Sequence, residues 1–298
     1  MDDGNAMSKP IKNIALSKHR KLLHIAQTNH QDFNGLQRRY LQERFLYRVS
    51  QSAYKNKFIL KGGLLLMTID LPSARPTMDI DFLAQYVSRN EQDLKQIFKE
   101  ICAVHVDDGI TFDTTAITTE EIDKDGDYNG TRVKFTAVMG SSKTPISIDL
   151  GFSDVLVPEP REINFPTILA EPSPNLHAYC LETIIAEKFE AITKLALTNS
   201  RMKDFYDLYM ILTEQHLNTD ALKKAIKATF ENRKTPLIPN PIAFTSTFYA
   251  DADKQRQWQA FLNKRGIQSA PSDLKTVVKT IKEALTPLVK EINRPANY

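Results

Sequence analysis

Residues 58–83, FILKGGLLLMTIDLPSARPTMDIDFL, are the stretch that decides the fold. The run KFIL (57–60) predicts a short strand, which ends just before Gly62 and Gly63. The LLLMTI that follows the glycines is typical of the start of a helix. Met78–Leu83 then alternate apolar and acidic side chains, which indicates a second strand. The segment therefore predicts a strand, a Gly-Gly turn, a helix and another strand in close succession.

Asp79 and Asp81 stand two positions apart on the second strand, so their side chains point to the same face. Neighbouring carboxylates repel each other unless a cation lies between them, and magnesium binds carboxylates together with water and phosphate oxygens. Asp149, within the apolar run ISIDLGF, is a third acid that would be costly to bury alone. We expect all three at one metal site. A purely structural role, on a solvated edge strand, is the alternative.

Lys61, Gly62 and Gly63 mark the junction between the first strand and the helix. Two glycines let the backbone come close to a ligand, and N–H groups at a helix start favour a phosphate. A bare Gly-Gly pair also occurs as a simple tight turn. Its position sixteen residues before Asp79 favours phosphate binding.

Helical and strand patterns continue on both sides of this motif. The expected elements are two helices within residues 11–50, a helix over 90–102 capped by Ser88, strands at 110–117, 131–139 and 145–152, a hairpin turn at Asp125–Gly130, a proline-rich crossing or linker at 157–177, and helices from Tyr179 onward. This order predicts an α/β or α+β core with a helical appendage. We expect an N-terminal helical segment (1–50), a core (51–170) and a helical C-terminal domain (171–298).

A second group of charged residues lies in the helical region. Lys188 falls within the apolar stripe of LETIIAEKFEAITKLAL, where an ammonium loses solvation unless it meets an anion. We expect it to reach a carboxylate or a triphosphate, with snorkelling along the helix as the alternative. Asp204 and Asp207, in RMKDFYDLYMIL, lie at the edge of a buried helical face. They are candidate partners for Lys188 and Arg201, or simple helix-start acids.

The composition is that of an ordinary globular protein, with 42% hydrophobic and 25% charged residues in 298. No run approaches eighteen apolar residues, and the N-terminus lacks the apolar segment of a signal peptide. Cys102 and Cys180 show no metal-ligand spacing and argue against a zinc site or a disulfide framework. These features exclude a transmembrane protein and favour a cytoplasmic one.

The net charge of +3 is unevenly distributed along the chain. Residues 1–60 contain eleven Lys/Arg and four Asp/Glu, residues 61–220 fourteen and twenty-six, and residues 221–298 fourteen and six. An acidic centre between basic ends suggests metal-binding carboxylates flanked by a surface for a polyanion. Solvated helix faces would give the same pattern. The aromatic residues of the basic C-terminal region are available for base stacking, but we expect most of them in the core.

The segment FILKGGLLLMTIDLPSARPTMDIDFL resembles the signature of the AbiEii/AbiGii family of nucleotidyltransferase-like toxins. That family is similar to the DNA polymerase β nucleotidyltransferase superfamily, whose pattern is Gly-Gly or Gly-Ser, then hDhDh, then a later hDh strand. The matching positions are Gly62, Gly63, Asp79, Asp81 and Asp149, with Arg75 and Thr77 matching an Arg-x-Ser/Thr before the DxD. Gly63 departs from the pattern because it lacks the serine hydroxyl that many superfamily members offer to a phosphate. The gap from the glycines to the DxD is also longer than in most of the superfamily.

The run AEKFEAI…RMKDFYDLYMIL resembles the second conserved block of the toxin family, where a Lys and an Asp complete the active site. The resemblance places that Lys at Lys188 and that Asp at Asp207 or Asp204. It covers roughly residues 55–215. Both blocks in the right order are more specific than either alone.

The resemblance implies a polymerase β-type nucleotidyltransferase core with a mixed sheet, and transfer of a nucleotide from a nucleoside triphosphate in the presence of Mg²⁺ or Mn²⁺. Asp79 and Asp81 would bind metal, Asp149 would serve as a ligand or base at the acceptor hydroxyl, Lys61, Gly62, Gly63 and Thr77 would lie at the phosphates, and Lys188 and Arg75 would neutralise the pyrophosphate. It implies a tRNA 3′ end as acceptor, a place in a toxin–antitoxin or phage-defence system, and an antitoxin encoded nearby that need not bind the toxin directly.

Two other functions stay open at this point. One is nucleotidyl transfer to a protein or to a small molecule such as an antibiotic. The other is a non-catalytic nucleotide-binding module. A glycosyltransferase also uses a DxD motif, but the early Gly-Gly pair and the later ISIDLGF strand favour nucleotidyl transfer.

Overall fold

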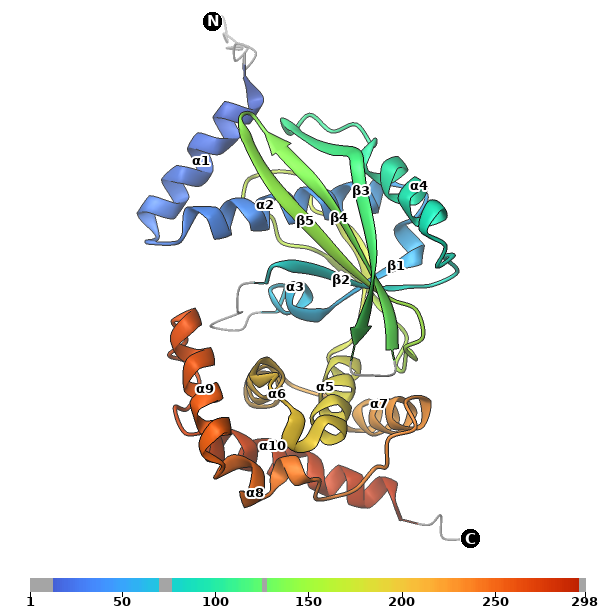
Figure 1. The fold of residues 1–298 in the computed structure, drawn as a ribbon, viewed down its shortest axis with the longest axis vertical. Helices are drawn as coiled ribbons and strands as arrows, with labels where there is room; N and C mark the ends of the chain where they lie inside the picture. Colours follow the sequence, from blue (N-terminus) through green and yellow to red (C-terminus); the bar gives the residue numbers. More distant parts are fainter. Residues whose placement is uncertain (1–12, 70–76, 125–127, 295–298) are drawn as a thin grey trace, which may run out of the picture.

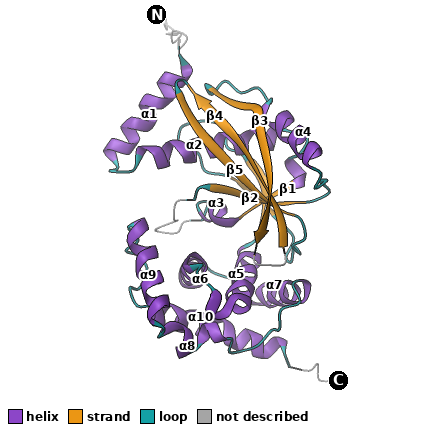
Figure 2. Cartoon of the chain, in the orientation of Figure 1, coloured by secondary structure: helices purple, strands orange, loops and turns teal. Residues whose placement is uncertain are grey.

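The computed structural model describes residues 13–69, 77–124 and 128–294. The helices are α1 (Ile14–Thr28), α2 (Phe33–Gln51), α3 (Gly62–Leu66), α4 (Glu91–Cys102), α5 (Leu181–Leu195), α6 (Met202–Glu214), α7 (Thr219–Asn232), α8 (Ser246–Tyr249), α9 (Ala252–Arg265) and α10 (Leu274–Ile292). The strands are β1 (Phe58–Lys61), β2 (Asp79–Ala84), β3 (Ile110–Lys124), β4 (Tyr128–Met139), β5 (Ser142–Gly151), β6 (Arg161–Asn164) and β7 (Asn175–Ala178). One half of the molecule holds the sheet with α1 to α4, and the other half is helical (Figures 1 and 2). The predicted mixed α/β fold is confirmed.

The seven strands form one sheet in the order β3-β4-β5-β2-β1-β7-β6. Strand β2 runs antiparallel to β1 and parallel to β5, so the sheet is mixed. The register places Asp81 beside Lys61 on one side and beside Asp149 on the other. Residues paired across neighbouring strands share a face, so these three side chains lie on the same face of the sheet.

The opposite face of the sheet carries an aromatic core. Phe82 of β2 and Phe58 of β1 are buried, and their rings lie 5.5 Å apart between centroids. Phe45 of α2 and Phe98 of α4 pack against this face of the sheet, and the ring of each contacts Phe135 of β4. Because side chains alternate along a strand, burying Phe82 on this face turns Asp79 and Asp81 to the other one. Core packing therefore fixes the direction of the two carboxylates.

The residue expected to cap α4 was wrong. The cap of α4 is Asn90, whose side chain accepts the N–H groups of Gln92 at 2.8 Å and Asp93 at 3.3 Å. Ser88 instead accepts the N–H of Asn90. The capping acceptor must lie directly before the first helical turn, and that position belongs to Asn90.

The proline-rich segment is not only a linker, because it contains β6 and β7. Strand β7 pairs in parallel with β1, and β6 pairs antiparallel with β7. The predicted division of the chain at residue 170 falls between these two strands.

The predicted turn at 125–130 includes residues 125–127, which lie outside the described residues. The flanking strands β3 and β4 pair at Lys124 and Tyr128.

The helical half belongs to the same buried core as the sheet half, and the C-terminal aromatic residues lie largely inside it. Phe230, Phe244, Phe248 and Trp258 are all buried, so they are not exposed platforms for base stacking. Phe189 of α5 stacks on Phe244 with 5.6 Å between ring centroids. The prediction that most of these aromatics serve the core is confirmed. Among the described residues, no helix is long and apolar enough to cross a membrane.

A buried acid on α2 gives a first prediction. Glu43 is fully buried, and one carboxylate oxygen accepts the N–H of Ile168 at 2.8 Å. Burial raises the pKa of Glu43 to about 7, from an ordinary 4.5. The folded state therefore favours the protonated acid. Its contribution to stability is complete below pH 4.5 and is lost as the pH rises through 7.

We expect Glu43→Gln to be more stable than the wild type at pH 8, by up to about 3 kcal/mol, and nearly equal to it at low pH. Glutamine keeps the shape of the protonated acid but cannot ionise. Urea unfolding of both proteins at pH 5 and pH 8 measures the difference. An equal difference at the two pH values would contradict the assignment.

Candidate active site

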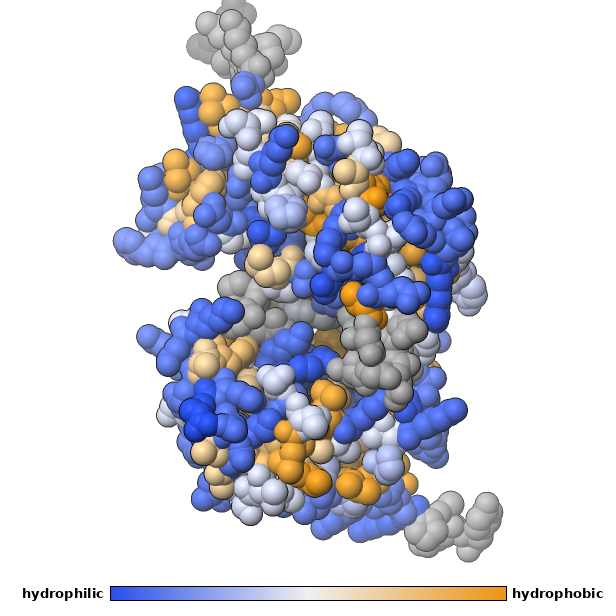
Figure 3. All heavy atoms as spheres, in the orientation of Figure 1, coloured by the Kyte–Doolittle hydropathy of each residue, from blue (hydrophilic) through white to orange (hydrophobic). Residues whose placement is uncertain are grey.

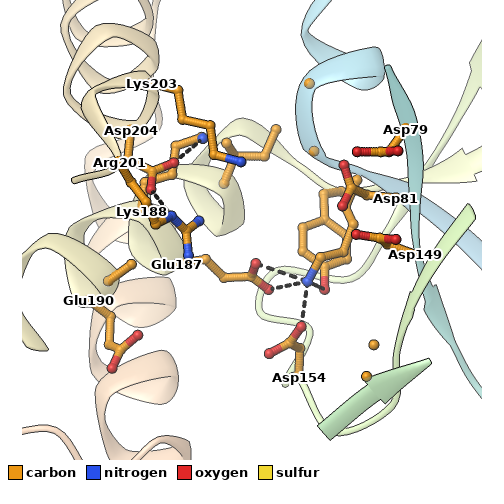
Figure 4. A pocket seen from close by; sticks show the side chains of 18 of the residues that line it. Asp79, Asp81, Asp149, Asp154, Glu187, Lys188, Glu190, Arg201, Lys203 and Asp204 are labelled. Carbon is orange, nitrogen blue, oxygen red and sulfur yellow. Dashed lines mark hydrogen bonds and ion pairs between the residues drawn. The ribbon is translucent and has the colours of Figure 1, made fainter. Parts of the chain in front are cut away.

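A pocket of about 420 Å³ lies between the sheet and the helical half. The surface is notched between the two halves, with hydrophilic residues along much of the border (Figure 3). One wall comes from β1, β2, α3, β4 and β5, and the other from α5, α6 and the end of α7 (Figure 4). The lining residues include Lys61, Gly62, Gly63, Thr77, Asp79, Asp81, Asp149, Lys188 and Asp204. The structure thus brings together most of the predicted site, from segments more than a hundred residues apart.

The sheet wall presents three carboxylates. Asp79 and Asp81 lie on one face of β2 and are half-buried, and Asp149 of β5 is 4% exposed. Figure 4 shows the three side chains directed into the pocket from neighbouring strands. Asp207 of the predicted set is not on this wall but is buried in α6.

Asp149 does not stand alone, because Arg132 of β4 holds it. Arg132 Nε and Nη2 donate to the two Asp149 oxygens at 2.7 and 3.0 Å. The β4–β5 register places these two residues directly opposite each other. The hydrogen bonds to Asp149 raise the pKa of Arg132 above its usual value. Sequence reasoning missed Arg132, since its role depends on a strand register that the sequence does not display.

Gly62 lets the chain turn directly beside Asp81. Its φ of +70° is in the left-handed region, which favours glycine. A Cβ at this position would meet Asp81 Oδ2 at 2.2 Å, closer than any real contact. The glycine therefore makes room for the second carboxylate of the DxD pair. Thr77 lies at the rim and donates to the carbonyl of Asp79 at 3.3 Å. Arg75 lies outside the described residues.

On the helical wall, Lys188 reaches two buried carboxylates. Its Nζ lies 2.8 Å from Asp204 Oδ1 and 2.7 Å from Asp207 Oδ2. Arg201 Nε is 2.7 Å from the other Asp204 oxygen. Burial alone would raise the pKa of Asp204, but Lys188 and Arg201 hold it well below its usual range. The predicted contact of Lys188 with a carboxylate is confirmed, and both candidate acids take part in it.

Lys61 joins the sheet to the helices at one side of the pocket. Its Nζ binds Asp154 and lies 3.0 Å from Glu187 Oε2 of α5. Arg233, just after α7, binds Asp154 at 2.7 Å and Glu190 at 2.8 Å. Burial alone would lower the pKa of Lys61, but the two nearby carboxylates raise it above its usual value. Lys61 thus contributes to an ion cluster between the two halves.

The opposing wall is rich in cations. Lys188, Lys194, Arg201 and Lys203 line the pocket from α5 and the start of α6. Lys203 projects from the helical wall toward the side of the pocket that holds Asp81 (Figure 4). A pocket with carboxylates on one wall and cations on the other can hold a metal-bound polyphosphate, with the metal at the acids and phosphate oxygens at the cations.

Two of the three carboxylates of the sheet wall suit a divalent cation, and the third is held by an arginine. Asp79 and Asp81 supply the hard oxygen donors that Mg²⁺ or Mn²⁺ prefers. Within the part of the chain that the structure describes, no group of three His, Cys, Asp or Glu side chains is poised to hold a metal ion. Both oxygens of the third acid, Asp149, are engaged by Arg132. The site therefore offers a carboxylate pair with a third carboxylate beside it.

A mixed sheet that gathers the Gly-Gly turn, the DxD pair and a third aspartate in one pocket defines a nucleotidyltransferase. The chain belongs to the AbiEii family, described as nucleotidyl transferase AbiEii toxin of a type IV toxin–antitoxin system, which matches residues 44–285. Membership implies a nucleoside triphosphate substrate and a cognate antitoxin, and nucleotidyltransferases in general use divalent metals.

Two solved structures resemble the chain at low identity. A candidate nucleotidyltransferase from H. pylori is 16% identical with a TM-score of 0.49, over 90% of this chain and 100% of that one. JHP933 from Helicobacter pylori is 15% identical with a TM-score of 0.49, over 88% of this chain and 94% of that one. No curated protein matches the sequence.

Proposed function

We propose that this chain transfers a nucleoside monophosphate from a nucleoside triphosphate to the 3′ end of a tRNA, with Mg²⁺ or Mn²⁺ bound by Asp79 and Asp81. The observation that carries the proposal is the placement of both carboxylates on one face of β2, with Asp81 in register with Asp149 and the pair facing a cationic wall. The metal dependence follows from the need to hold two like charges and a polyphosphate in one pocket.

Each wall has a part in the proposed reaction. When bound, a divalent cation stabilises the attacking and leaving oxygens. Asp149 lies beside the DxD pair, where it would orient the acceptor hydroxyl or add a metal ligand. The turn at Gly62 and Gly63 brings backbone close to the phosphates. Lys188 and other cations of the helical wall would neutralise charge that develops on the pyrophosphate.

The charge of the helical half supports an RNA acceptor. Lys223, Lys224 and Lys227 of α7 line a shallow hollow together with Arg294 and Glu291. Glu291 pairs with Lys223 at 3.1 Å, which leaves an excess of basic side chains in the hollow. The same helix ends next to Arg233, which lies in the main pocket. A basic surface at one end of α7 and the reaction site at the other suit an acceptor strand that follows the helix into the pocket.

The test is a transfer assay. Purified protein is incubated with total RNA, magnesium and each of the four α-labelled nucleoside triphosphates in turn, alongside an Asp79→Ala/Asp81→Ala variant. We expect label on a tRNA-sized band, absent with the variant. Label on the protein itself would indicate a protein acceptor instead of RNA. Label on a small molecule such as an antibiotic would indicate a small-molecule acceptor. Triphosphate binding without any transfer would favour a non-catalytic module.

The RNA surface can be tested separately by charge reversal. Because Lys224 and Lys227 are exposed, Lys224→Glu/Lys227→Glu should keep the fold and leave triphosphate binding unchanged. We expect RNA binding to weaken by about tenfold or more and the slope of log K against log salt to fall by about 2. The matched control, Lys275→Glu/Lys279→Glu, reverses two exposed lysines on α10. Equal weakening in both variants would show a general charge effect and would argue against a surface on α7.

The turn at Gly62 gives a further prediction. In Gly62→Ala the new Cβ displaces the Asp81 carboxylate, so we expect transfer to fall by about a hundredfold, the effect of moving a reacting group by about 1 Å. Gly266→Ala is the control, because Gly266 has a similar φ of +60° but nothing within 4 Å of its Cβ position. Both variants share the backbone strain. If both lose transfer equally, strain is the cause and the contact with Asp81 is not.

A further inference from the structure

Arg132 binds Asp149 in a geometry that leaves neither carboxylate oxygen uncommitted. The guanidinium donates in parallel from Nε and Nη2, at 2.7 and 3.0 Å, to a side chain that is 4% exposed. Such two-pronged pairs are among the strongest hydrogen-bonded contacts in proteins. An arginine cannot release its partner by losing a proton, because it stays charged at every physiological pH. Each Asp149 oxygen keeps a second lone pair, but the positive guanidinium at this distance opposes the approach of another cation.

The structure also contains an alternative partner for Arg132. Glu120 of β3 lies opposite Arg132 in the β3–β4 register, and its Oε1 is 3.7 Å from Arg132 Nη1. The Arg132 side chain is 29% exposed, so it has room to move at the edge of the pocket. A guanidinium that leaves Asp149 thus has a second carboxylate nearby, which it would share with Lys134, whose Nζ lies 2.7 Å from Glu120 Oε1.

We propose that Arg132 is a positioning residue that competes with a divalent cation for Asp149, and that it shifts toward Glu120 when the cation takes its place. This inference rests on the proposed function, because it assumes that Asp79 and Asp81 attract a metal. In the absence of metal, Arg132 compensates the charge of the buried Asp149 and keeps it from repelling its two neighbours. Arg132 would thereby hold the third carboxylate in place and delay its use until the metal is bound.

The competition predicts that weakening Arg132 strengthens metal binding. We expect Arg132→Gln to bind Mn²⁺ about tenfold more tightly than the wild type, since it removes both the rival donor and one nearby positive charge. Arg132→Lys separates these two effects, because lysine keeps the charge but cannot bind both oxygens of Asp149. Its affinity should lie between the other two. Mn²⁺ affinity is read from the electron paramagnetic resonance signal of free Mn²⁺, without any transfer reaction.

Lys143→Gln is the matched control. Lys143 is exposed on β5 and does not line the pocket, so its loss removes a charge from the sheet without touching Glu120 or the carboxylates of the pocket. We expect its Mn²⁺ affinity to stay within about twofold of the wild type. If Arg132→Lys binds Mn²⁺ like the wild type, charge alone is at work and the competition is overturned. Equal or weaker binding by Arg132→Gln, or no Mn²⁺ binding by any variant, overturns it as well.

The inference and the proposed function can fail separately. Asp149→Asn should abolish the tightening caused by Arg132→Gln, because the contested carboxylate is gone. Tighter Mn²⁺ binding by the Arg132 variants in a protein that transfers no nucleotide would support the competition and refute the function. Transfer by the wild type, without tighter Mn²⁺ binding by the Arg132 variants, would support the function and refute the competition. Should Arg132→Gln fail to fold, the lysine variant, which keeps the buried charge compensated, still decides the question.

Discussion

Asp81→Asn is expected to lower the rate of nucleotidyl transfer by at least about a thousandfold while the protein stays folded. The substitution keeps the size of the side chain and removes the negative charge that faces the cationic wall. If a metal ion is held there, the loss affects the stabilisation of both the attacking and the leaving oxygen. The aromatic core lies on the other face of β2, so packing is not disturbed.

The measurement is the initial rate of transfer, with Mn²⁺ affinity and urea unfolding recorded for the same protein. Asp107→Asn is the matched control, because the Asp107 side chain is 85% exposed and does not line the pocket. We expect the control to keep the wild-type rate. A wild-type rate in Asp81→Asn would show that the DxD pair is not the reaction centre. A large loss of stability would mean that the carboxylate supports the fold instead.

The sequence identified the carboxylates because their spacing carries the information. Asp79 and Asp81 alternate with apolar residues, so their common face follows from the geometry of a strand. Asp149 interrupts an apolar run, and because a lone buried carboxylate is costly, its position indicates a partner nearby. Lys188 stands within an apolar helical stripe for the same reason, and the structure gives it two carboxylate partners. Each of these residues breaks the hydrophobic pattern around it, and that break can be read from the sequence alone.

The residues that sequence reasoning missed violate no local pattern. Arg132 and Asp154 stand in segments where a charged residue is unremarkable, and Glu187 belongs to an ordinary helix. Their importance comes from pairing across strands and between the two halves of the molecule. The prolines around β6 and β7 misled in a similar way, because both strands are only four residues long. They extend the sheet beyond β1, with β6 as its edge strand. Register and tertiary pairing have no signature in a single sequence.

Lys188→Met should destabilise the protein by about 3 kcal/mol or more at neutral pH, the second large effect that the structure predicts. Asp204 is fully buried and Asp207 is 2% exposed, and both carboxylates bind the Lys188 ammonium. Methionine preserves the apolar stem but leaves the two acids without this cation. Arg201 still lies beside Asp204, which limits the loss.

The pH dependence and a compensating variant separate charge from packing. Because the pKa of Asp204 is held well below its usual range, its contribution to stability is present above about pH 4 and is lost as the pH falls. The gap between wild type and Lys188→Met should therefore shrink between pH 7 and pH 4, because Asp204 without the Lys188 ammonium takes up a proton more readily. Lys188→Met/Asp204→Asn/Asp207→Asn should recover most of the stability at pH 7, because the two buried carboxylates that lost this cation are then neutral amides. If urea unfolding shows a gap that does not change with pH and is not recovered in the triple variant, Lys188 stabilises the protein through the packing of its stem and not through the two carboxylates.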